Sequence, residues 1–187
     1  MSPASPLFVA GQDATLLADV KARLRDVPDF PKPGILFKDV TPVLADPQLF
    51  HRVVDAMAAP FRGQGIQRVV AVESRGFLLG APIALGLNVG FAPARKPGKL
   101  PWRARTERYA LEYGEDALQL HEDAVSPGDR VLIVDDLLAT GGTAAATERL
   151  VTSLGGHVVG YSFLISLDFL PGRERLGRDK VCALLSY

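Results

Sequence analysis

The 187-residue sequence has a single cysteine, no excess of charge of either sign and no long apolar run. One cysteine excludes an intramolecular disulfide, and the apolar run VCALL around Cys182 predicts a buried, unreactive thiol. There are 21 basic and 21 acidic residues, a balance that argues against a general nucleic-acid-binding protein. No window approaches the roughly 18–20 apolar residues of a membrane helix, and the start MSPASPLFVAG does not read as a signal peptide. We therefore expect a cytoplasmic protein that binds neither nucleic acid nor membrane.

The three histidines are too widely spaced to suggest a metal site. His51, His121 and His157 resemble no known set of metal ligands. We therefore expect no metal held by the protein itself.

Strand-like and helix-like segments alternate along the chain, which predicts an α/β fold with a central parallel sheet flanked by helices. No repeat or linker divides residues 1–187, so we expect a single domain. Residues 28–38 are rich in proline and predict a non-helical loop, and residues 97–114 form a long polar stretch. Helices are expected at 13–26, 46–59 and 142–154, and strands at 68–74, 88–95, 130–136, 156–167 and 180–187.

The segment VLIVDDLLATGGT (131–143) predicts a site for a ribose phosphate. Its buried run ends in two carboxylates, Asp135 and Asp136, which we expect at the carboxyl end of a parallel strand, where ligands bind. Adjacent acids would repel a phosphate, so they are better suited to accept hydrogen bonds from sugar hydroxyls. The glycines let the backbone approach a ligand, and the start of the next helix suits a phosphate group. The expected phosphate contacts are Ala139, Thr140, Gly141, Gly142 and Thr143.

Other glycine-rich phosphate loops do not fit this segment. A Walker loop needs Gly-Lys-Ser/Thr at a fixed spacing, and a dinucleotide fingerprint has separated glycines. The alternative without a ligand is a strand, a glycine turn and a helix with capping acids.

This segment resembles the phosphoribosyl pyrophosphate (PRPP) motif of the type I phosphoribosyltransferases. In the 6-oxopurine branch the acid pair is usually Glu-Asp and an Asp stands at the position of Ala139, so Asp-Asp with alanine is similar to the adenine branch. Four further segments resemble that branch in the same order: DFPKPGILFKDVTPVL (29–44), ESRGFLLGAPIA (73–84), RKPGKLP (95–101) and LEYG (111–114).

The resemblance implies a type I phosphoribosyltransferase fold with a small N-terminal hood at about 28–40 and a mobile catalytic loop at about 100–113. It implies a homodimeric enzyme of purine salvage that converts adenine and PRPP to AMP and pyrophosphate. Magnesium would arrive on PRPP, because Mg²⁺ prefers phosphate oxygens to an all-protein cage.

The resemblance also implies roles for individual residues outside the phosphate loop. Arg75 follows a strand and would hold pyrophosphate in two-pronged fashion, with a strained or cis peptide near Ser74–Arg75. The alternative for Arg75 is a surface residue at a helix start. The positive cluster that would also bind pyrophosphate, or would otherwise be a solvated loop, consists of Arg95, Lys96 and Lys99.

The purine would lie between Phe37 and Leu137, with the backbone near Leu36 reading N1 and the 6-amino group. Glu112 would handle the proton on the purine ring and act as a catalytic residue together with Asp135 and Asp136. The alternatives are core packing for Phe37 and an exposed loop position for Glu112. The loop segment WRARTER (102–108) is unusually basic, a departure from the family.

Three other functions compete with this hypothesis. The first is a phosphoribosyltransferase for another base, such as xanthine or orotate. The second is a non-catalytic regulator that binds PRPP, but about 28 residues precede the hood and show no helix-turn-helix pattern. The third, an unrelated nucleotide-binding module, does not explain the number and order of the matching segments.

Overall fold

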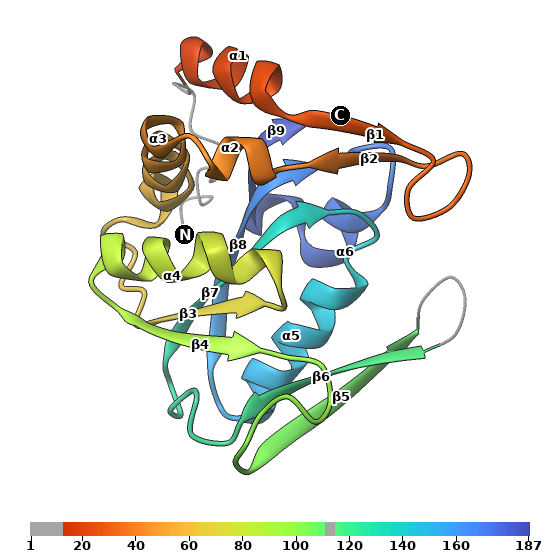
Figure 1. Cartoon of the computed structure of the whole chain (residues 1–187). Helices are drawn as coiled ribbons and strands as arrows, with labels where there is room; N and C mark the ends of the chain where they lie inside the picture. Colours follow the sequence, from red (N-terminus) through yellow and green to blue (C-terminus); the bar gives the residue numbers. More distant parts are fainter. Residues whose placement is uncertain (1–12, 111–114) are drawn as a thin grey trace.

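A five-stranded parallel sheet in the order β4-β3-β7-β8-β9 forms the centre of the molecule (Figure 1). The structure is a computed structural model that describes residues 13–110 and 115–187. The expected parallel sheet is confirmed, and each expected strand lies within it. The strands are β3 (Arg68–Val72), β4 (Gly90–Ala94), β7 (Arg130–Leu138), β8 (His157–Ser166) and β9 (Val181–Ser186).

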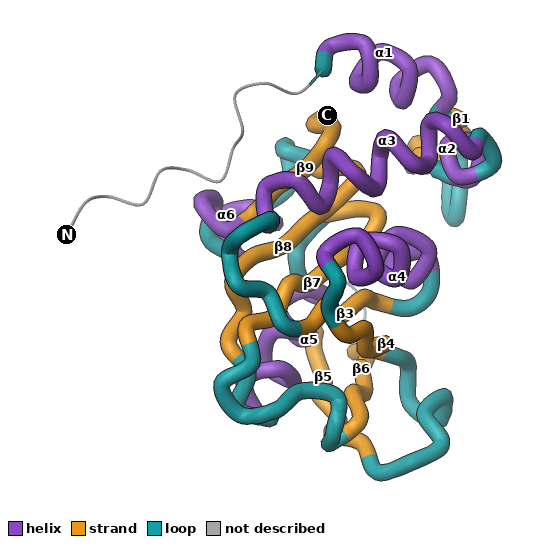
Figure 2. Tube along the Cα trace, turned by 90° about the vertical axis from the view of Figure 1, so that its left-hand side faces the viewer, coloured by secondary structure: helices purple, strands orange, loops and turns teal. Residues whose placement is uncertain are grey.

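Helices cover both faces of this sheet and bury two separate hydrophobic cores (Figure 2). Along β7, Leu132 and Val134 point into the core beneath α3 (Pro47–Ala58) and α4 (Arg75–Leu87). Val131 and Ile133 alternate with them and point into the core beneath α5 (Gly142–Ser153). Burial on both faces explains why the strand is an unbroken apolar run.

The helix starts follow the capping residues expected from the sequence. The Asp13 side chain accepts a hydrogen bond from Thr15 N at the start of α1 (Ala14–Arg23). The Asp46 side chain accepts from Gln48 N and Leu49 N at the start of α3, with Pro47 at the first helical position. The shorter helices are α2 (Thr41–Leu44), η1 (Ala59–Phe61), α6 (Gly172–Leu176) and η2 (Arg178–Lys180).

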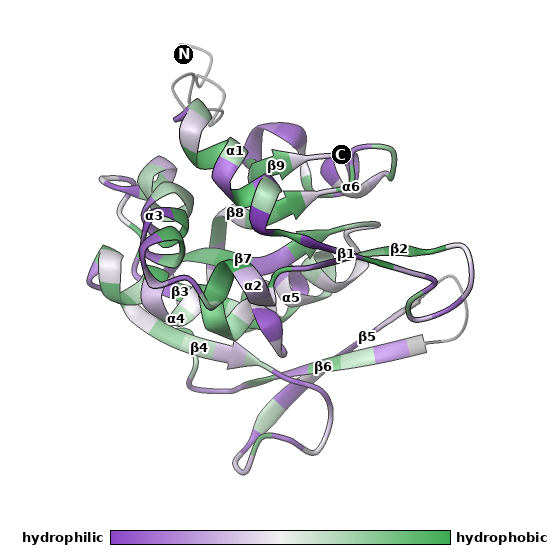
Figure 3. Ribbon diagram, turned by 45° about the horizontal axis from the view of Figure 1, so that its top comes forward, coloured by the Kyte–Doolittle hydropathy of each residue, from purple (hydrophilic) through white to green (hydrophobic). Residues whose placement is uncertain are grey.

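Two antiparallel hairpins stand apart from the central sheet, and both revise the loops expected from the sequence. The first joins β1 (Arg25–Pro28) to β2 (Leu36–Asp39), so the proline-rich segment is the turn of a hairpin rather than a loop throughout. In Figure 3 β1 is mainly hydrophilic, whereas β2 (LFKD) begins with two hydrophobic residues.

The second hairpin joins β5 (Ala104–Ala110) to β6 (Glu115–His121), within and after the stretch expected to be a mobile loop. Seven residues of that stretch, Ala104–Ala110, therefore form a strand. The physical reason lies in β6, whose Leu118 and Leu120 are buried in the α5-side core and fix the register of the hairpin. Among the described residues no helix is both long enough and apolar enough to cross a membrane.

Candidate active site

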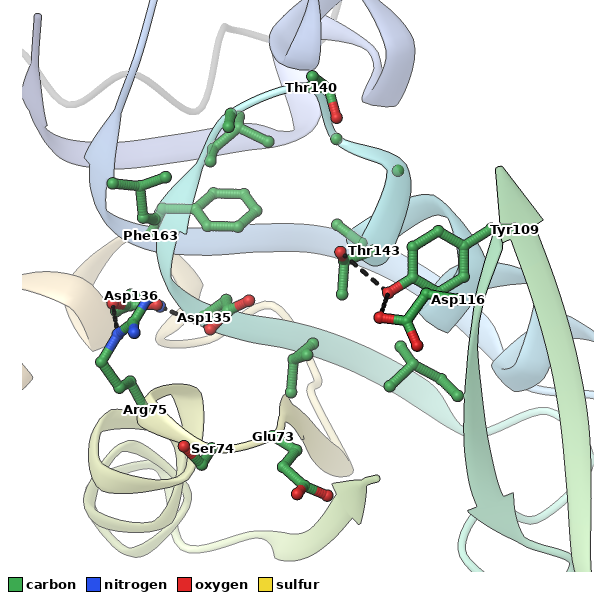
Figure 4. Close-up of a pocket in the computed structure, with 18 of the residues that line it drawn as sticks. Glu73, Ser74, Arg75, Tyr109, Asp116, Asp135, Asp136, Thr140, Thr143 and Phe163 are labelled. Carbon is green, nitrogen blue, oxygen red and sulfur yellow. Dashed lines mark hydrogen bonds and ion pairs between the residues drawn. The ribbon is translucent and has the colours of Figure 1, made fainter. Parts of the chain in front are cut away.

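A cavity of about 380 Å³ opens where β7 runs into α5 (Figure 4). Its wall combines the junction of β3 and α4, the end of β7, the loop before α5 and the inner face of the β5–β6 hairpin. Of the residues expected to act, those that line it are Arg75, Lys96, Asp135, Asp136, Leu137, Ala139, Thr140, Gly141, Gly142 and Thr143.

The sequence places the two carboxylates at the carboxyl end of a strand over 130–136, and in the structure they lie within β7, which continues to Leu138. The pairing of β3 with β7 ends at Ala71 and Val134, whereas β8 continues beside β7 as far as Leu138. Asp135 and Asp136 therefore begin the part of β7 that extends past β3. Strand β8 still pairs with this part of the β7 backbone, and the cavity lies on the other side, where β3 has ended.

The carboxylates occupy different electrostatic environments. The Asp136 side chain is buried and accepts a hydrogen bond from Nε of Arg75. Asp135 accepts a hydrogen bond of 2.9 Å from the backbone N–H of Asp136. Burial, together with the adjacent charge of Asp136, raises the pKa of Asp135 well above its ordinary value. The unliganded site therefore disfavours the ionised form of Asp135.

The loop from Ala139 to Thr143 ends in a helix start without a capping side chain. Gly141 is the N-cap of α5 with φ +76°, a conformation that favours glycine, and no side chain of the described residues caps it. The first intrahelical bond runs from Ala145 N to Gly141 O. The N–H groups just before Ala145 have no partner in a preceding turn, and they form a site for an anion.

The β5–β6 hairpin contributes two polar cavity residues that the sequence does not indicate. Tyr109 and Asp116 are paired in register across the hairpin, and the Tyr109 hydroxyl donates to Asp116 Oδ2 at 3.3 Å. Thr143 Oγ1 donates to the Tyr109 hydroxyl at 3.4 Å, and Lys96 Nζ donates to Asp116 Oδ2 at 2.9 Å. Figure 4 shows the hydroxyl of Tyr109 between Thr143 and Asp116. Only the strand register brings these residues together, so no local motif indicates them.

Arg95 and Lys99 do not line the cavity, unlike Lys96. Arg95 donates from Nε to Glu73 Oε2 at 3.0 Å and from its guanidinium to the carbonyl oxygen of Lys99 at 3.1 Å. Glu73 lies on the cavity wall and accepts from the backbone N–H of Lys96 at 3.0 Å. Arg95 therefore stabilises the cavity wall through its contact with Glu73 and does not face the cavity itself.

The junction of β3 and α4 places Arg75 at the carboxyl edge of the sheet, as expected. A cis peptide bond is present at Glu73–Ser74, one bond earlier than the sequence resemblance implied. The Arg75 guanidinium lies over the ring of Phe37 at 5.2 Å, and this ring packs edge-on against Phe30 at 5.1 Å. The β1–β2 hairpin therefore reaches the cavity through Arg75.

Two of the three expected adenine contacts do not line the cavity. Leu36 and Phe37 do not line the cavity, and Leu36 is 53% exposed. Leu137 does line it. Glu112 lies outside the described residues.

Known proteins resemble this chain along nearly all of its length. The family model described as the phosphoribosyl transferase domain matches residues 41–175. The adenine phosphoribosyltransferase of Myxococcus xanthus (strain DK1622) is 70% identical over 94% of this chain and 95% of its own length. The chain belongs to the adenine phosphoribosyltransferase family.

Solved structures of this family share the fold. The adenine phosphoribosyltransferase of Rhodothermus marinus has a TM-score of 0.89 and 53% identity, over 94% of this chain and 100% of that one. The Saccharomyces cerevisiae family member was solved with an imino-altritol bisphosphate and adenine. It has a TM-score of 0.87 and 42% identity, over 92% of this chain and 100% of that one. The type I phosphoribosyltransferase fold expected from the sequence is thus confirmed.

Proposed function

We propose that this enzyme transfers the 5-phosphoribosyl group of PRPP to adenine and releases AMP and pyrophosphate. In this reaction the bond from C1′ to the pyrophosphate oxygen breaks, a bond from C1′ to N9 of adenine forms, and the N9 proton is lost. The observation that carries the proposal is the uncapped start of α5 beside two carboxylates in one cavity, with Ala139 where the 6-oxopurine branch has an acid.

The ribose 5-phosphate half of PRPP would occupy the loop and the acid pair. Residues 139–143 present backbone N–H groups and threonine hydroxyls to the 5′-phosphate. Asp135 and Asp136 accept hydrogen bonds from the ribose hydroxyls, and their negative charge favours the positive charge that develops on the sugar ring. Because β8 holds this part of β7, the carboxylates keep their positions as that charge develops.

The pyrophosphate half would bind Arg75 and Lys96, which also line the cavity. Each cation already has a carboxylate partner, Asp136 for Arg75 and Asp116 for Lys96. PRPP would therefore bind by taking over part of these ion pairs. Arg95 and Lys99 are proposed to join this group once the chain adjusts around the diphosphate. Magnesium enters as part of the substrate, on the pyrophosphate oxygens.

Adenine would lie between Leu137 and the β1–β2 hairpin, with Phe37 on the outer face and the backbone near Leu36 reading the 6-amino edge. Contact of Phe37 with the base requires the hairpin to move toward the cavity, because its ring now packs on Arg75. Glu112 is proposed to take the N9 proton. A 6-oxopurine presents the reverse donor and acceptor pattern, and such a mismatch can reduce the rate by about 10⁴–10⁵.

The test is turnover with PRPP and Mg²⁺, with adenine, hypoxanthine, xanthine and orotate compared as acceptors and pyrophosphate release as the readout. We expect adenine to be preferred by at least about 10³ in kcat/KM. A preference for any of the other three would refute the substrate assignment. Size-exclusion chromatography with light scattering tests the proposed homodimer separately.

Asp136→Asn tests the assignment of the ribose. We expect kcat/KM to fall by about 100-fold, because the reacting sugar loses both a charge and its position. The circular dichroism spectrum should remain that of the wild type. A mutant with wild-type rates would contradict the assignment of Asp136 to the ribose.

A further inference from the structure

The short helix α6 lies directly against the loop that precedes α5 (Figure 1). A Cβ on Gly172 would lie 2.3 Å from the carbonyl oxygen of Ala139 and 2.8 Å from Cδ1 of Leu138. From the other side, a Cβ on Gly141 would lie 3.1 Å from the carbonyl oxygen of Gly172. The backbones of α6 and the loop are therefore in contact, so interactions that hold α6 in position also hold the loop in position.

A buried arginine fixes α6. Arg173 is 8% exposed, and its Nε donates to Asp168 Oδ1 at 2.8 Å and to Ser166 Oγ at 3.2 Å. Its terminal nitrogens donate to Ser186 Oγ at 3.2 Å and to the carbonyl oxygen of Val181 at 3.4 Å. These acceptors belong to β8, β9 and the turn after β8, so α6 is tied to the sheet edge.

With α6 held in this way, Arg175 extends along the phosphate loop. Its Cδ lies 3.4 Å from the Cβ position of Gly141, and its NH1 lies 3.4 Å from the Cβ position of Gly142. Gly142 is the first residue of α5. Arg175 is exposed, and its side chain forms no ion pair or hydrogen bond with any of the described residues.

A cation at this place is electrostatically unfavourable in the empty enzyme. The start of a helix carries partial positive charge, which disfavours a neighbouring guanidinium and favours an anion. The carboxylate nearest in sequence, Glu174, is already paired with Arg178. An anion between Arg175 and the free N–H groups of α5 would satisfy both at once.

We propose that Arg175 is a further binding residue for the 5′-phosphate, acting from outside the phosphate motif. The inference rests on the proposed function, which assigns this loop to the 5′-phosphate. The guanidinium adds a charge-assisted contact to a dianion that the loop otherwise binds with neutral donors. Arg175 therefore favours phosphorylated ligands such as PRPP and AMP over the unphosphorylated nucleoside.

The experiment compares Arg175→Gln with Arg178→Gln, which changes a neighbouring exposed arginine paired with Glu174. For each variant, KM for PRPP, KM for adenine and kcat are measured, and the affinities for AMP and adenosine are measured by calorimetry. We expect Arg175→Gln to raise KM for PRPP and Kd for AMP by about 5- to 20-fold. KM for adenine and Kd for adenosine should remain unchanged, and Arg178→Gln should match the wild type throughout.

Two further readouts separate binding from a structural effect. The Tm of unliganded Arg175→Gln should equal or exceed that of the wild type, because an unfavourable cation has been removed. Arg175→Lys should recover part of the affinity for PRPP, since the charge is retained without the fork.

Equal losses of AMP and adenosine affinity, or unchanged KM for PRPP in Arg175→Gln, would overturn the proposal. Either result is distinct from failure of the proposed function, which wild-type turnover of adenine with PRPP tests independently. A wild-type enzyme that uses adenine and an Arg175→Gln variant with unchanged KM would leave the function standing and remove only Arg175 from the site.

Discussion

Two of the three glycines of helix α4, Gly76 and Gly86, should change stability in opposite directions when replaced by alanine. A Cβ on Gly76 would lie 2.8 Å from Asp135 Oδ1, 3.0 Å from the carbonyl oxygen of Val134 and 3.2 Å from Asp135 Cα. A Cβ on Gly86 would meet nothing within 4 Å. Neither glycine has positive φ, so alanine strains the backbone at neither position. The pair isolates the effect of close packing against the acid-bearing strand.

The expected magnitudes follow from these contacts. In a helix alanine is favoured over glycine by about 0.5–1 kcal/mol, and Gly86→Ala should gain up to this amount. At Gly76 the same gain is outweighed by overpacking of about 1–3 kcal/mol, because backbone atoms of β7 must shift. The net loss is about 1–2 kcal/mol. For a chain of this length, Tm should rise by about 1–4 °C in Gly86→Ala and fall by about 2–8 °C in Gly76→Ala.

Differential scanning calorimetry and steady-state turnover measure the two effects. Since the added methyl group displaces the carboxylate of Asp135, Gly76→Ala should also lower kcat/KM by about tenfold or more, whereas Gly86→Ala keeps the wild-type value. If Gly76→Ala were as stable and as active as Gly86→Ala, the close contact between α4 and β7 could not be what positions Asp135.

Three further predictions concern buried polar groups. Burial and the charge of Asp136 raise the pKa of Asp135 above its ordinary value of 3.8, so the folded state loses stability as the pH rises above that value and Asp135 ionises. Asp135→Asn removes this loss, and it should therefore raise the Tm of the unliganded enzyme more at about pH 8 than at about pH 4. Its activity should fall. Burial raises the pKa of the Cys182 thiol to about 11, so Ellman's reagent at about pH 8 should react with it only after denaturant is added. Arg173→Met leaves Asp168 and its neighbours without their hydrogen-bond donor, and it should lower the free energy of unfolding, measured by urea denaturation, by about 2 kcal/mol. A urea midpoint equal to that of the wild type would contradict the role of Arg173 in fixing α6.

The central sheet could be predicted from the sequence because its signals are local. Unbroken apolar runs such as residues 131–134 require burial on both faces, and that burial implies parallel strands covered by helices. Asp13 and Asp46 mark helix starts through contacts with residues two and three positions away. The phosphate loop could also be predicted, since its glycines and the following helix are contiguous in the chain.

The part of the cavity wall formed by the β5–β6 hairpin could not be predicted, because the contacts that form it are not local in sequence. The side chains of Tyr109 and Asp116 meet only through the register of β5 with β6, and Lys96 joins them from a third segment. The sequence predicts that the strand ends with the acid pair, at Asp136, because charged residues usually terminate an apolar run. In the structure β8 continues beside β7 past the last residue of β3, and this pairing keeps the acids within the strand.

The residues around Tyr187 determine where a fusion tag can be attached. Arg173 donates two of its hydrogen bonds to Ser186 and Val181, and the N–H of Tyr187 donates to the carbonyl oxygen of Ser166. The ring of Tyr187 also lies 4.5 Å from Lys38 Nζ on the β1–β2 hairpin. A purification tag joined directly after Tyr187 would disturb the contacts of Arg173, which fixes α6 against the phosphate loop. It would also disturb the hairpin proposed to cover adenine. Kinetic work on this enzyme therefore calls for a cleavable handle at the other end of the chain.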